Sequence, residues 1–373
     1  MTKKVLIVYA TGGMGHVTSA RAIEEAFRQK YPDVETKNVD VIDFATKVYK
    51  KVFVDGYNLV SAKTPELWGW LYRQFNNRTN QKLPNLLSKL AIEGNFIPFV
   101  QEYKPDFIIS THPLPMVLLS VSKKHDVIDI LSSMVVTDFG CHSFWVDPEV
   151  NFYFVATPAV GQCLLQYNAD PKKIVPTGIP IEPKFSKELN KSELQQKFGL
   201  KPDVFTLLFV GCLFTFEVLK QEIDQIQASG VRAQFIVVAG RDAVLKAALE
   251  KANFGANQNI KVFGFVNNLE ELMTVSDAIF SKAGGLTSSE CMAKGLPMII
   301  NKVIPGQEEG NVEYLVSQSA AIKVNDFSEI SQVVVDLINN PTKLQNLKQA
   351  ALKIGKPKSA ETLVDFVYKI INK

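Results

Sequence analysis

Short apolar runs recur along the chain, and most of them end at a glycine or a polar segment that is followed by a helical pattern. The first run, residues 4–10, predicts a strand, and the glycine-rich residues 11–15 predict a tight turn. Residues 16–30 then carry their apolar side chains at helical spacing, and residues 34–39 predict the next strand. This order is typical of a parallel sheet that binds its ligands at the carboxyl ends of its strands.

The alternation of strands and helices forms two series. The later predicted strands are residues 107–110, 133–136 and 151–156 in the first series, and residues 205–210, 235–239, 260–263, 278–280, 298–300 and 321–324 in the second. Residues 185–202 are predicted to form a helix that leads into the second series. We therefore expect two α/β domains, residues 1–180 and 181–358, followed by an amphipathic helix at 359–373.

Composition narrows the class of protein. The 373 residues are 46% hydrophobic with a net charge of only +3, which fits a globular protein and argues against a general nucleic-acid binder. No apolar run reaches the roughly 18 to 20 residues that span a membrane, so any membrane contact is expected to be peripheral, and the N-terminus reads as a strand rather than a signal peptide. Cys141, Cys163, Cys212 and Cys291 lie far apart without a CxxC pair. We expect neither a zinc site nor a disulfide framework, and a reducing cytoplasm is the compartment that fits best.

Residues 277–311 carry the clearest chemical signal. Residues 278–280 predict a buried strand, and the turn at Gly284 and Gly285 leads into a helix. A helix that begins at such a turn directs free backbone N–H groups and the positive end of its dipole at one point, where a phosphate fits well. A polar loop, residues 305–311, follows the next predicted strand and would open on the same edge of the sheet.

The motifs SKAGGLTSSE, GLPMII and PGQEEGN stand in this order within that stretch. They resemble the donor-binding half of the monogalactosyldiacylglycerol-synthase-like and processive diacylglycerol glucosyltransferases, which are family 28 glycosyltransferases of the GT-B fold. The resemblance implies two Rossmann-like domains whose parallel sheets face each other across a cleft, with the helix at 359–373 packed back on the first domain. It also implies a UDP-sugar donor in the second domain, a lipid acceptor beside the first, and transfer with inversion.

Glu290 has two interpretations. It lies three residues after Thr287, so the pair fits a helix capping box. In the resembled family an equivalent carboxylate accepts both hydroxyls of the donor ribose, and the surrounding motif favours this second role. The full set of expected donor residues is Gly211, Arg241, Phe265, Val266, Gly284, Gly285, Leu286, Thr287, Glu290, Gln307, Glu308 and Asn311. We expect no metal, because the backbone amides meet the diphosphate and no DxD motif is evident.

The first glycine turn also has two interpretations. Gly13-x-Gly15-x-x-Thr18 together with Asp40 fits part of a dinucleotide fingerprint, as in an NAD-dependent oxidoreductase. In the resembled family a similar turn lies beside the acceptor, which makes His16 a candidate catalytic residue. The plainer alternative is a histidine at a helix N-terminus that is bonded to backbone.

Asp138 is the second candidate base. It follows the predicted strand 133–136, and α/β enzymes carry catalytic groups at this edge of the sheet, although aspartate also commonly caps a turn there. A glycosyl transfer needs a base for the acceptor hydroxyl, and His16 and Asp138 stand as alternatives for that role. The other residues expected beside the acceptor are Gly13, Gly15, His112 and His142.

Between Ala45 and about Phe99 the α/β pattern is replaced by lysine, arginine and aromatic residues. Tryptophan and tyrosine favour the headgroup level of a membrane, and basic residues are attracted to anionic lipid. Alternatively, the aromatic residues are core residues of helices packed on the sheet. A lipid acceptor favours a membrane-facing surface at the inner face of the cell membrane. The residues expected there are Lys50, Lys51, Trp68, Trp70, Arg73 and Arg78.

We therefore predict a hexosyltransferase that moves glucose or galactose from a UDP-sugar to a diacylglycerol-type lipid. The alternatives are transfer to another lipid-linked carrier of cell-wall synthesis, an NAD-dependent oxidoreductase, and a non-catalytic UDP-sugar sensor. The sensor is suggested by the bulky residues that follow Gly211, where related enzymes carry a glycine-rich loop.

Overall fold

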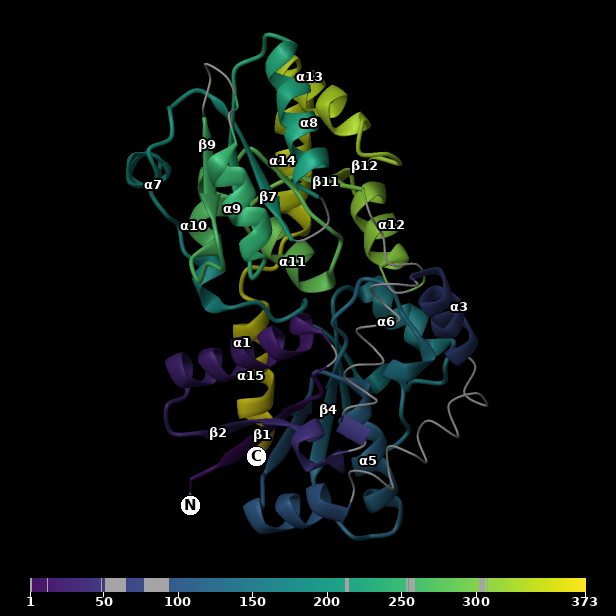
Figure 1. The fold of residues 1–373 in the computed structure, drawn as a ribbon. Helices are drawn as coiled ribbons and strands as arrows, with labels where there is room; N and C mark the ends of the chain where they lie inside the picture. The colour runs from purple at the N-terminus through teal and green to yellow at the C-terminus, as the bar shows by residue number, and fades with distance from the viewer. Residues whose placement is uncertain are drawn as a thin grey trace.

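The computed structural model describes residues 2–11, 13–47, 49–50, 65–76, 94–211, 215–252, 254, 259–301, 306 and 308–373. Within these residues the chain folds into two halves, each built on a six-stranded parallel sheet with helices on both faces (Figure 1). This arrangement confirms the predicted fold class of two Rossmann-like α/β units.

Helices and strands alternate through both halves. The first half contains β1 (Lys4–Tyr9), α1 (Met14–Lys30), β2 (Glu35–Asp40), η1 (Val41–Phe44), α3 (Pro65–Phe75), a helical stretch at 94–103, β3 (Phe107–Ser110), α5 (Pro113–Lys124), β4 (Leu131–Val135), η3 (Ser143–Trp145), β5 (Phe152–Val155), α6 (Pro158–Leu165), η4 (Pro171–Lys173) and β6 (Ile174–Pro176). The second contains η5 (Pro183–Ser186), α7 (Lys191–Phe198), β7 (Phe205–Val210), α8 (Phe216–Ala228), β8 (Ala233–Val238), α9 (Ala243–Lys251), β9 (Ile260–Phe263), α10 (Leu269–Val275), β10 (Ala278–Phe280), α11 (Gly285–Ala293), β11 (Met298–Ile300), α12 (Glu309–Ser317), β12 (Ala321–Lys323), α13 (Glu329–Asn339) and α14 (Pro341–Ile354). The last helix, α15 (Ser359–Ile371), returns to the first half.

The strand orders are β2-β1-β3-β4-β5-β6 and β12-β11-β10-β7-β8-β9. In each sheet the chain starts at an inner strand, β1 or β7, and adds strands on both sides of it. Because all the strands are parallel, their carboxyl ends lie at one edge of the sheet. In such sheets ligands bind at that edge, near the point where the winding direction changes. Both halves turn this edge toward the other half (Figure 1).

Helices on both faces explain why inner strands such as β1 and β7 read as mainly apolar runs rather than alternating ones. Val5 and Ile7 of β1 pack in a cluster with residues of α1 and α15, whereas Leu6 and Val8 pack in a cluster with residues of α5. All four side chains are fully buried. Since successive side chains of a strand point to opposite faces, each face of β1 is covered by its own helical layer.

The predicted helix over residues 185–202 is wrong. The structure has the short helix η5 and then α7 in its place. Asn190 starts α7 by accepting hydrogen bonds from the backbone N–H groups of Ser192 and Glu193, and Gly199 ends it in the left-handed conformation with φ 62°. The asparagine cap and the terminating glycine were both readable in the sequence.

The chain crosses between the halves twice, at residues 177–181 and 355–358, and the two crossings lie side by side. Gly178 has φ +89°, and a Cβ there would lie 2.8 Å from Cβ of Lys356. The backbone N–H of Ile181 donates a hydrogen bond to Oγ of Ser359 at 3.4 Å. Beyond the second crossing α15 packs on the first half, where Tyr368 stacks on Tyr31 at 3.8 Å between ring centroids.

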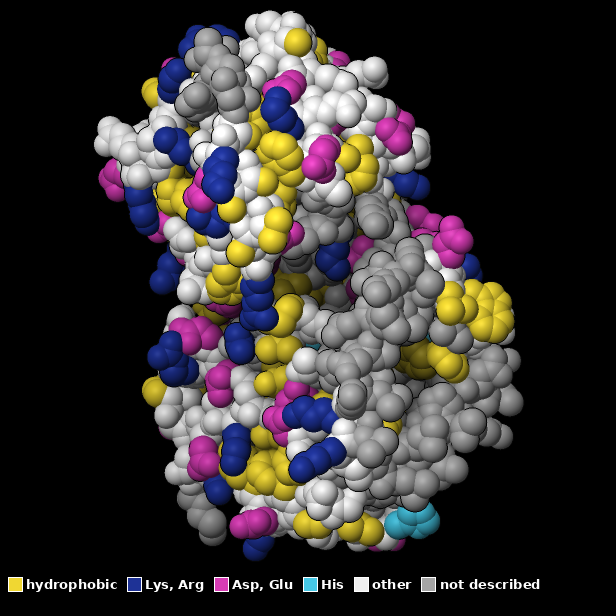
Figure 2. Space-filling model, viewed as in Figure 1, with side chains coloured by type: hydrophobic (Ala, Val, Ile, Leu, Met, Phe, Trp, Pro, Cys, Tyr) yellow, Lys and Arg dark blue, Asp and Glu magenta, His cyan; other side chains and the backbone are white. Residues whose placement is uncertain are grey.

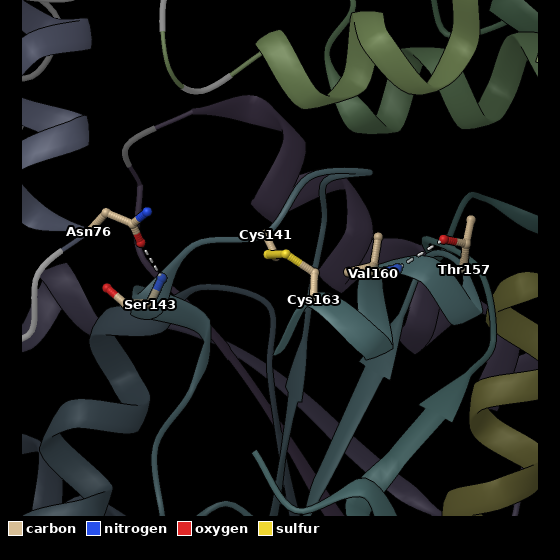
Figure 3. The surroundings of a disulfide bond; sticks show 6 residues. All are labelled: Asn76, Cys141, Ser143, Thr157, Val160 and Cys163. Carbon is tan, nitrogen blue, oxygen red and sulfur yellow. Dashed lines mark hydrogen bonds between the residues drawn. A yellow bond between two sulfur atoms is a disulfide. The ribbon is translucent and has the colours of Figure 1, made fainter. Parts of the chain in front are cut away.

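The cysteine expectation is corrected by the structure. Cys141 and Cys163 form a disulfide with their Cα atoms 6.1 Å apart, which joins the loop after β4 to α6 (Figure 3). The pair is 22 residues apart in sequence, but β4 and β5 are neighbours in the sheet, so the segments that follow them meet. Cys291 is a buried free thiol, and Cys212 lies outside the described residues.

Candidate active site

A cleft of about 550 Å³ separates the carboxyl edges of the two sheets. In the space-filling view a hollow lies between the upper and the lower half of the molecule (Figure 2). The N-terminal wall of the cleft consists of Gly13, Met14, Gly15, His16, Thr18, Arg21, Thr137 and Asp138. The C-terminal wall consists of Glu182, Lys184, Phe185, Val210, Gly211, Val238, Ala239, Gly240, Phe265, Val266, Asn267, Leu269, Lys282, Gly284, Gly285, Leu286, Thr287, Glu290 and Glu308.

The N-terminus of α11 lies at the centre of the C-terminal wall. Gly284 is its N-cap, and no side chain of the described residues caps the helix, so its first N–H groups and positive dipole end are available to an anion. Gly285 begins the helix against the opposite wall, because a Cβ there would lie 2.0 Å from the carbonyl oxygen of Thr137. The glycine pair therefore both opens the helix end and lets the two halves approach each other.

Glu290 faces the cleft from α11 and is only 6% exposed. The capping interpretation does not hold, because Thr287 is the third residue of the helix rather than its cap. No hydrogen bond to the Glu290 carboxyl is formed within the described part of the chain. Burial raises the pKa of Glu290 to about 8; Glu182 adds to this shift and Lys184 opposes it. Buried polar groups are normally hydrogen-bonded, so this carboxyl is available to bind a ligand at the cleft wall.

Two lysines of the C-terminal wall were not predicted from the sequence. Lys282 lies 3.0 Å from Glu308, and its side chain is 44% exposed. Lys184 lies 2.9 Å from Glu182 and 3.5 Å from Glu270. Lys282 directly precedes the glycine turn in SKAGG, which was a usable signal; Lys184 had none, because it lies in the linker, far from the motif in sequence.

The other expected donor residues divide into three groups. Gly211, Phe265 and Val266 line the cleft, and Phe265 is 63% exposed. The guanidinium of Arg241 lies over the Phe265 ring at 5.8 Å but is not itself part of the cleft wall. Gln307 and residues 212–214, which include the bulky residues after Gly211, lie outside the described residues.

Asn311 does not line the cleft, contrary to its expected donor contact. It is fully buried in α12, and its amide is used completely by protein groups. Its Oδ1 accepts from the Phe139 N–H at 2.6 Å, and its Nδ2 donates to Asp138 Oδ1 at 3.0 Å and to the Ala283 carbonyl at 2.9 Å. In this conformation the side chain links the two halves.

His16 lies at the start of α1 with its ring held by the backbone. Its Nδ1 donates to the Thr111 carbonyl at 2.6 Å, since a carbonyl can only accept, and the Thr137 hydroxyl lies 3.3 Å from the same nitrogen. This bond leaves Nε2 as the proton-accepting nitrogen of the neutral ring. Burial lowers the pKa of His16 to about 4, although the hydrogen bond to Thr111 opposes the shift. The backbone-bonded interpretation is thus correct for Nδ1 and leaves Nε2 for chemistry.

Asp138 extends from the loop after β4 into the cleft. Its carboxylate caps no helix or turn within the described residues; it accepts the hydrogen bond from Asn311. Burial raises the pKa of Asp138 to about 6, the Asn311 hydrogen bond lowers it, Glu308 raises it and Lys282 lowers it. A carboxyl with a pKa near 6 is ionised at neutral pH and is still basic enough to take a proton.

The remaining expected acceptor residues fall into two groups, those that line the cleft and those that do not. Gly13 and Gly15 line the cleft, but His112 and His142 do not. Nδ1 of His112 accepts from the Leu114 N–H and caps α5, and its ring packs edge-on against His16 at 4.7 Å. His142 is 1% exposed. Its Nδ1 accepts from the Phe144 N–H, and its Nε2 donates to the Tyr72 carbonyl at 2.8 Å, which attaches α3 to the loop after β4.

The dinucleotide interpretation of the first turn required Asp40 as the acid that binds a ribose. Oδ1 of Asp40 accepts from the backbone N–H groups of Thr11 and Ile42, and Oδ2 accepts from the Thr11 hydroxyl. The carboxylate therefore stabilises its own turn and starts η1, and it is not part of the cleft wall.

The expected membrane residues are described only in part. Lys51 and Arg78 lie outside the described residues, as does the side chain of Trp68. On α3 Trp70 is 53% exposed and the neighbouring Leu67 is 48% exposed, so neither is a core residue. Hydrophobic side chains are visible on the outer surface at α3 (Figure 2).

The two expected basic residues whose side chains are described are both paired with carboxylates. Lys50 pairs with Asp43 at 2.6 Å, and Arg73 pairs with Glu309 at 3.7 Å. Among the described helices none is long and apolar enough to cross a bilayer.

Two parallel Rossmann-like sheets that face each other across a cleft define the GT-B class of fold. Solved structures of this class cover nearly the whole chain. S. aureus MnaA with UDP aligns at a TM-score of 0.64 and 12% identity over 99% of this chain and 97% of that one. Acinetobacter baumannii MurG aligns at a TM-score of 0.62 and 15% identity over 98% and 99% of the two chains. At these identities the similarity establishes the fold alone.

Sequence comparison identifies the family. The model described as monogalactosyldiacylglycerol (MGDG) synthase matches residues 16–181, and the model described as glycosyltransferase family 28 C-terminal domain matches residues 209–363. The processive diacylglycerol beta-glucosyltransferase of Bacillus mycoides (strain KBAB4) is 31% identical over 98% of this chain and 93% of its own. The enzyme of the same name from Bacillus cereus (strain B4264) is 32% identical over the same shares. The chain belongs to this family of MGDG-synthase-like glycosyltransferases, which confirms the predicted resemblance and the predicted hexosyltransferase class.

Proposed function

We propose that this glycosyltransferase moves a hexose from a UDP-sugar to the hydroxyl of a diacylglycerol-type lipid, with inversion at the anomeric carbon. The family supports the class of donor and acceptor. The observation that carries the proposal is the unlike chemistry of the two walls. In the described residues, an uncapped helix N-terminus and a carboxyl without a partner face an aspartate and a histidine across one cleft.

The donor would bind on the C-terminal wall. Its diphosphate would meet the amides at the start of α11, with Lys282 as a nearby cation. The two ribose hydroxyls would donate to the Glu290 carboxyl, which would thereby gain hydrogen-bond partners. Phe265 and Val266 lie on the same wall, where the uracil would lie. The α11 amides and Lys282 would thus compensate the negative charge of the diphosphate.

The acceptor would approach along the N-terminal wall. Its hydroxyl oxygen attacks the anomeric carbon, the bond between that carbon and the UDP oxygen breaks, and the hydroxyl proton passes to a base. We assign the base to Asp138, because a pKa near the working pH gives the more effective general base, and a histidine with a pKa of about 4 is a weaker one. His16 is the alternative base, since its Nε2 is oriented by the Thr111 bond.

A lipid acceptor has to reach this wall from a bilayer. The exposed side chains of Leu67 and Trp70 on α3 support a peripheral contact with the membrane, which we place at its cytoplasmic face. His142 hydrogen-bonds the Tyr72 carbonyl of α3 from the loop that carries Asp138. The exposed side chains of α3 and the proposed base would therefore be attached to the same loop.

The direct test is UDP release from UDP-glucose and from UDP-galactose, with and without diacylglycerol vesicles. The expected result is lipid-dependent UDP release together with a glycosylated lipid. Binding of a UDP-sugar without lipid-dependent release would contradict the proposal and indicate a sensor. Vesicles that carry a polyprenyl phosphate sugar in place of diacylglycerol would reveal transfer to another lipid-linked carrier.

A further inference from the structure

The loop that carries Asp138 is docked on the opposite half through an asparagine. Asn311 is the third residue of α12, and it is fully buried. It reaches Asp138 and Phe139 in the first half and Ala283 in the second. Helix α12 therefore joins the C-terminal wall to the loop on the N-terminal wall.

The orientation of the Asn311 amide follows from its partners. The Phe139 N–H can only donate, so it requires the amide oxygen, and the Ala283 carbonyl can only accept, so it requires the amide nitrogen. The second hydrogen of Nδ2 then points at Asp138 Oδ1. Oδ2 of Asp138 is not engaged by this amide and is the oxygen left to receive a proton.

The surrounding contacts make this junction specific. A Cβ on Gly310 would lie 2.7 Å from Cα of Gly140, and one on Gly140 would lie 3.2 Å from Cα of Gly310, so the two backbones touch. The rings of Phe139 and Tyr314 stack with centroids 4.6 Å apart and planes 7° apart. The loop therefore contacts α12 in three ways: backbone against backbone, ring against ring, and through the Asn311 amide. Of these three contacts, only the one through the amide includes the Asp138 carboxylate.

We infer that Asn311 is a positioning residue that holds Asp138 in its working orientation, and that it does so only while the two halves are docked as in this structure. The inference rests on the proposed transferase function. The donor half thereby completes the arrangement of the base, so proton removal is coupled to closure of the cleft. In this role Asn311 orients the base and does not bind the sugar.

The charged and titratable groups around Asp138 set the sign of the expected pH effect. They are Glu308 and Lys282, both from the second half. His16 lines the same cleft, and its Nδ1 lies 3.3 Å from the hydroxyl of Thr137, the residue before Asp138. The Asn311 bond stabilises the ionised carboxylate, so its removal raises the pKa of Asp138. Activity that needs the carboxylate is lost as pH falls, and the loss begins at a higher pH in a variant without the amide.

The test uses the full chain with Asn311→Ala. We expect kcat to fall about 10- to 100-fold, with the acid limb of the pH profile displaced upward by about one pH unit, as befits the loss of one hydrogen bond to a charged group. The affinity for UDP-glucose should stay within about twofold of wild type. A loss of UDP-glucose affinity with an unmoved acid limb would overturn the inference and make Asn311 a sugar contact.

A second readout needs no activity. The Phe139 N–H donates to Asn311, so deuterium exchange in the peptide that contains Phe139 should quicken about tenfold in Asn311→Ala. Asn340→Ala removes a helix cap far from the cleft and should leave that peptide unchanged, which controls for general loss of stability. Unchanged exchange at Phe139 would overturn the inference. Failure of the wild type to transfer hexose would instead contradict the proposed function and leave this measurement valid.

Discussion

Among the described residues, the C-terminal wall of the cleft keeps a carboxyl and a helix N-terminus without side-chain partners, whereas the candidate bases of the N-terminal wall are already bonded to protein. Glu290 and the first amides of α11 have no side-chain partner in the described structure. His16 and Asp138 each use one atom for the fold, through Thr111 and Asn311 respectively, and keep one atom for chemistry. A wall that binds needs unsatisfied groups, and a wall that moves a proton needs oriented ones.

The largest effect should come from the proton-transfer wall. Asp138→Asn removes the base and should lower kcat roughly 10²- to 10⁴-fold while UDP affinity stays close to wild type. In the wild type kcat/KM should fall as pH drops through about 6, because burial raises the pKa of Asp138 to about 6 and only the carboxylate accepts a proton. Steady-state rates between about pH 4 and 8 measure this.

The same profile decides between the two candidate bases. Burial lowers the pKa of His16 to about 4, so a His16 base would keep full activity until the pH approaches 4. An acid limb at that lower pH, together with a larger loss in His16→Gln than in Asp138→Asn, would transfer the role of base to His16.

The contact between the walls comes next. Gly285→Ala places a methyl group against the Thr137 carbonyl, because an ideal Cβ would lie only 2.0 Å from that oxygen. The halves then cannot dock as they do in this structure, and misplacement of the acceptor wall should reduce kcat about 100-fold. Gly94→Ala is the matched control, since nothing lies within 4 Å of a Cβ at Gly94. Equal rates for the two variants would show that close docking is unnecessary.

The binding wall is tested by Glu290→Gln. We expect UDP-sugar affinity to fall about 10- to 100-fold, because the glutamine amide has one acceptor oxygen and leaves a buried ribose hydroxyl without its partner, which costs roughly 1 to 3 kcal/mol. Titration calorimetry measures it, with Glu250→Gln on exposed α9 as the control. Unchanged affinity would remove Glu290 from the donor site.

Glu290 should also leave a signature in stability. Burial raises its pKa to about 8, above the unfolded value, so the wild type is favoured at low pH and loses stability as pH rises from about 4.5 to about 8. Glu290→Gln lacks this ionisation, and its melting temperature should decline less over the same range. Parallel declines in the melting temperatures of the two proteins between about pH 5 and 8 would count against a buried carboxyl.

The smallest effect should be at the membrane surface. Leu67→Ser with Trp70→Ser removes two exposed apolar side chains from α3 and should weaken binding to diacylglycerol vesicles about tenfold, without changing UDP affinity. Val244→Ser on α9 is the control, because Val244 is 82% exposed on the other half. Vesicle sedimentation measures it, and equal binding of both variants would argue against a membrane role for α3.

Prediction from the sequence was most accurate for short apolar runs that form strands. The predicted strands that match the observed ones residue for residue are Phe107–Ser110, Phe205–Val210, Ile260–Phe263, Ala278–Phe280 and Met298–Ile300. Prediction was least accurate for polar side chains with ambiguous partners. His112 and His142 looked like acceptor residues, but each instead accepts a backbone N–H two residues further along the chain.

By itself the amino-acid sequence determined the two-sheet fold, the family and the glycine-framed helix end, because these depend on local periodicity, turn residues and motif order. The tertiary structure alone decided that Cys141 pairs with Cys163, that Lys184 joins the cleft, and that Asn311 binds Asp138 rather than lining the donor wall. These outcomes depend on which groups meet across the sheets and between the halves. A side chain's partner is a property of three-dimensional proximity, which no spacing along the chain encodes.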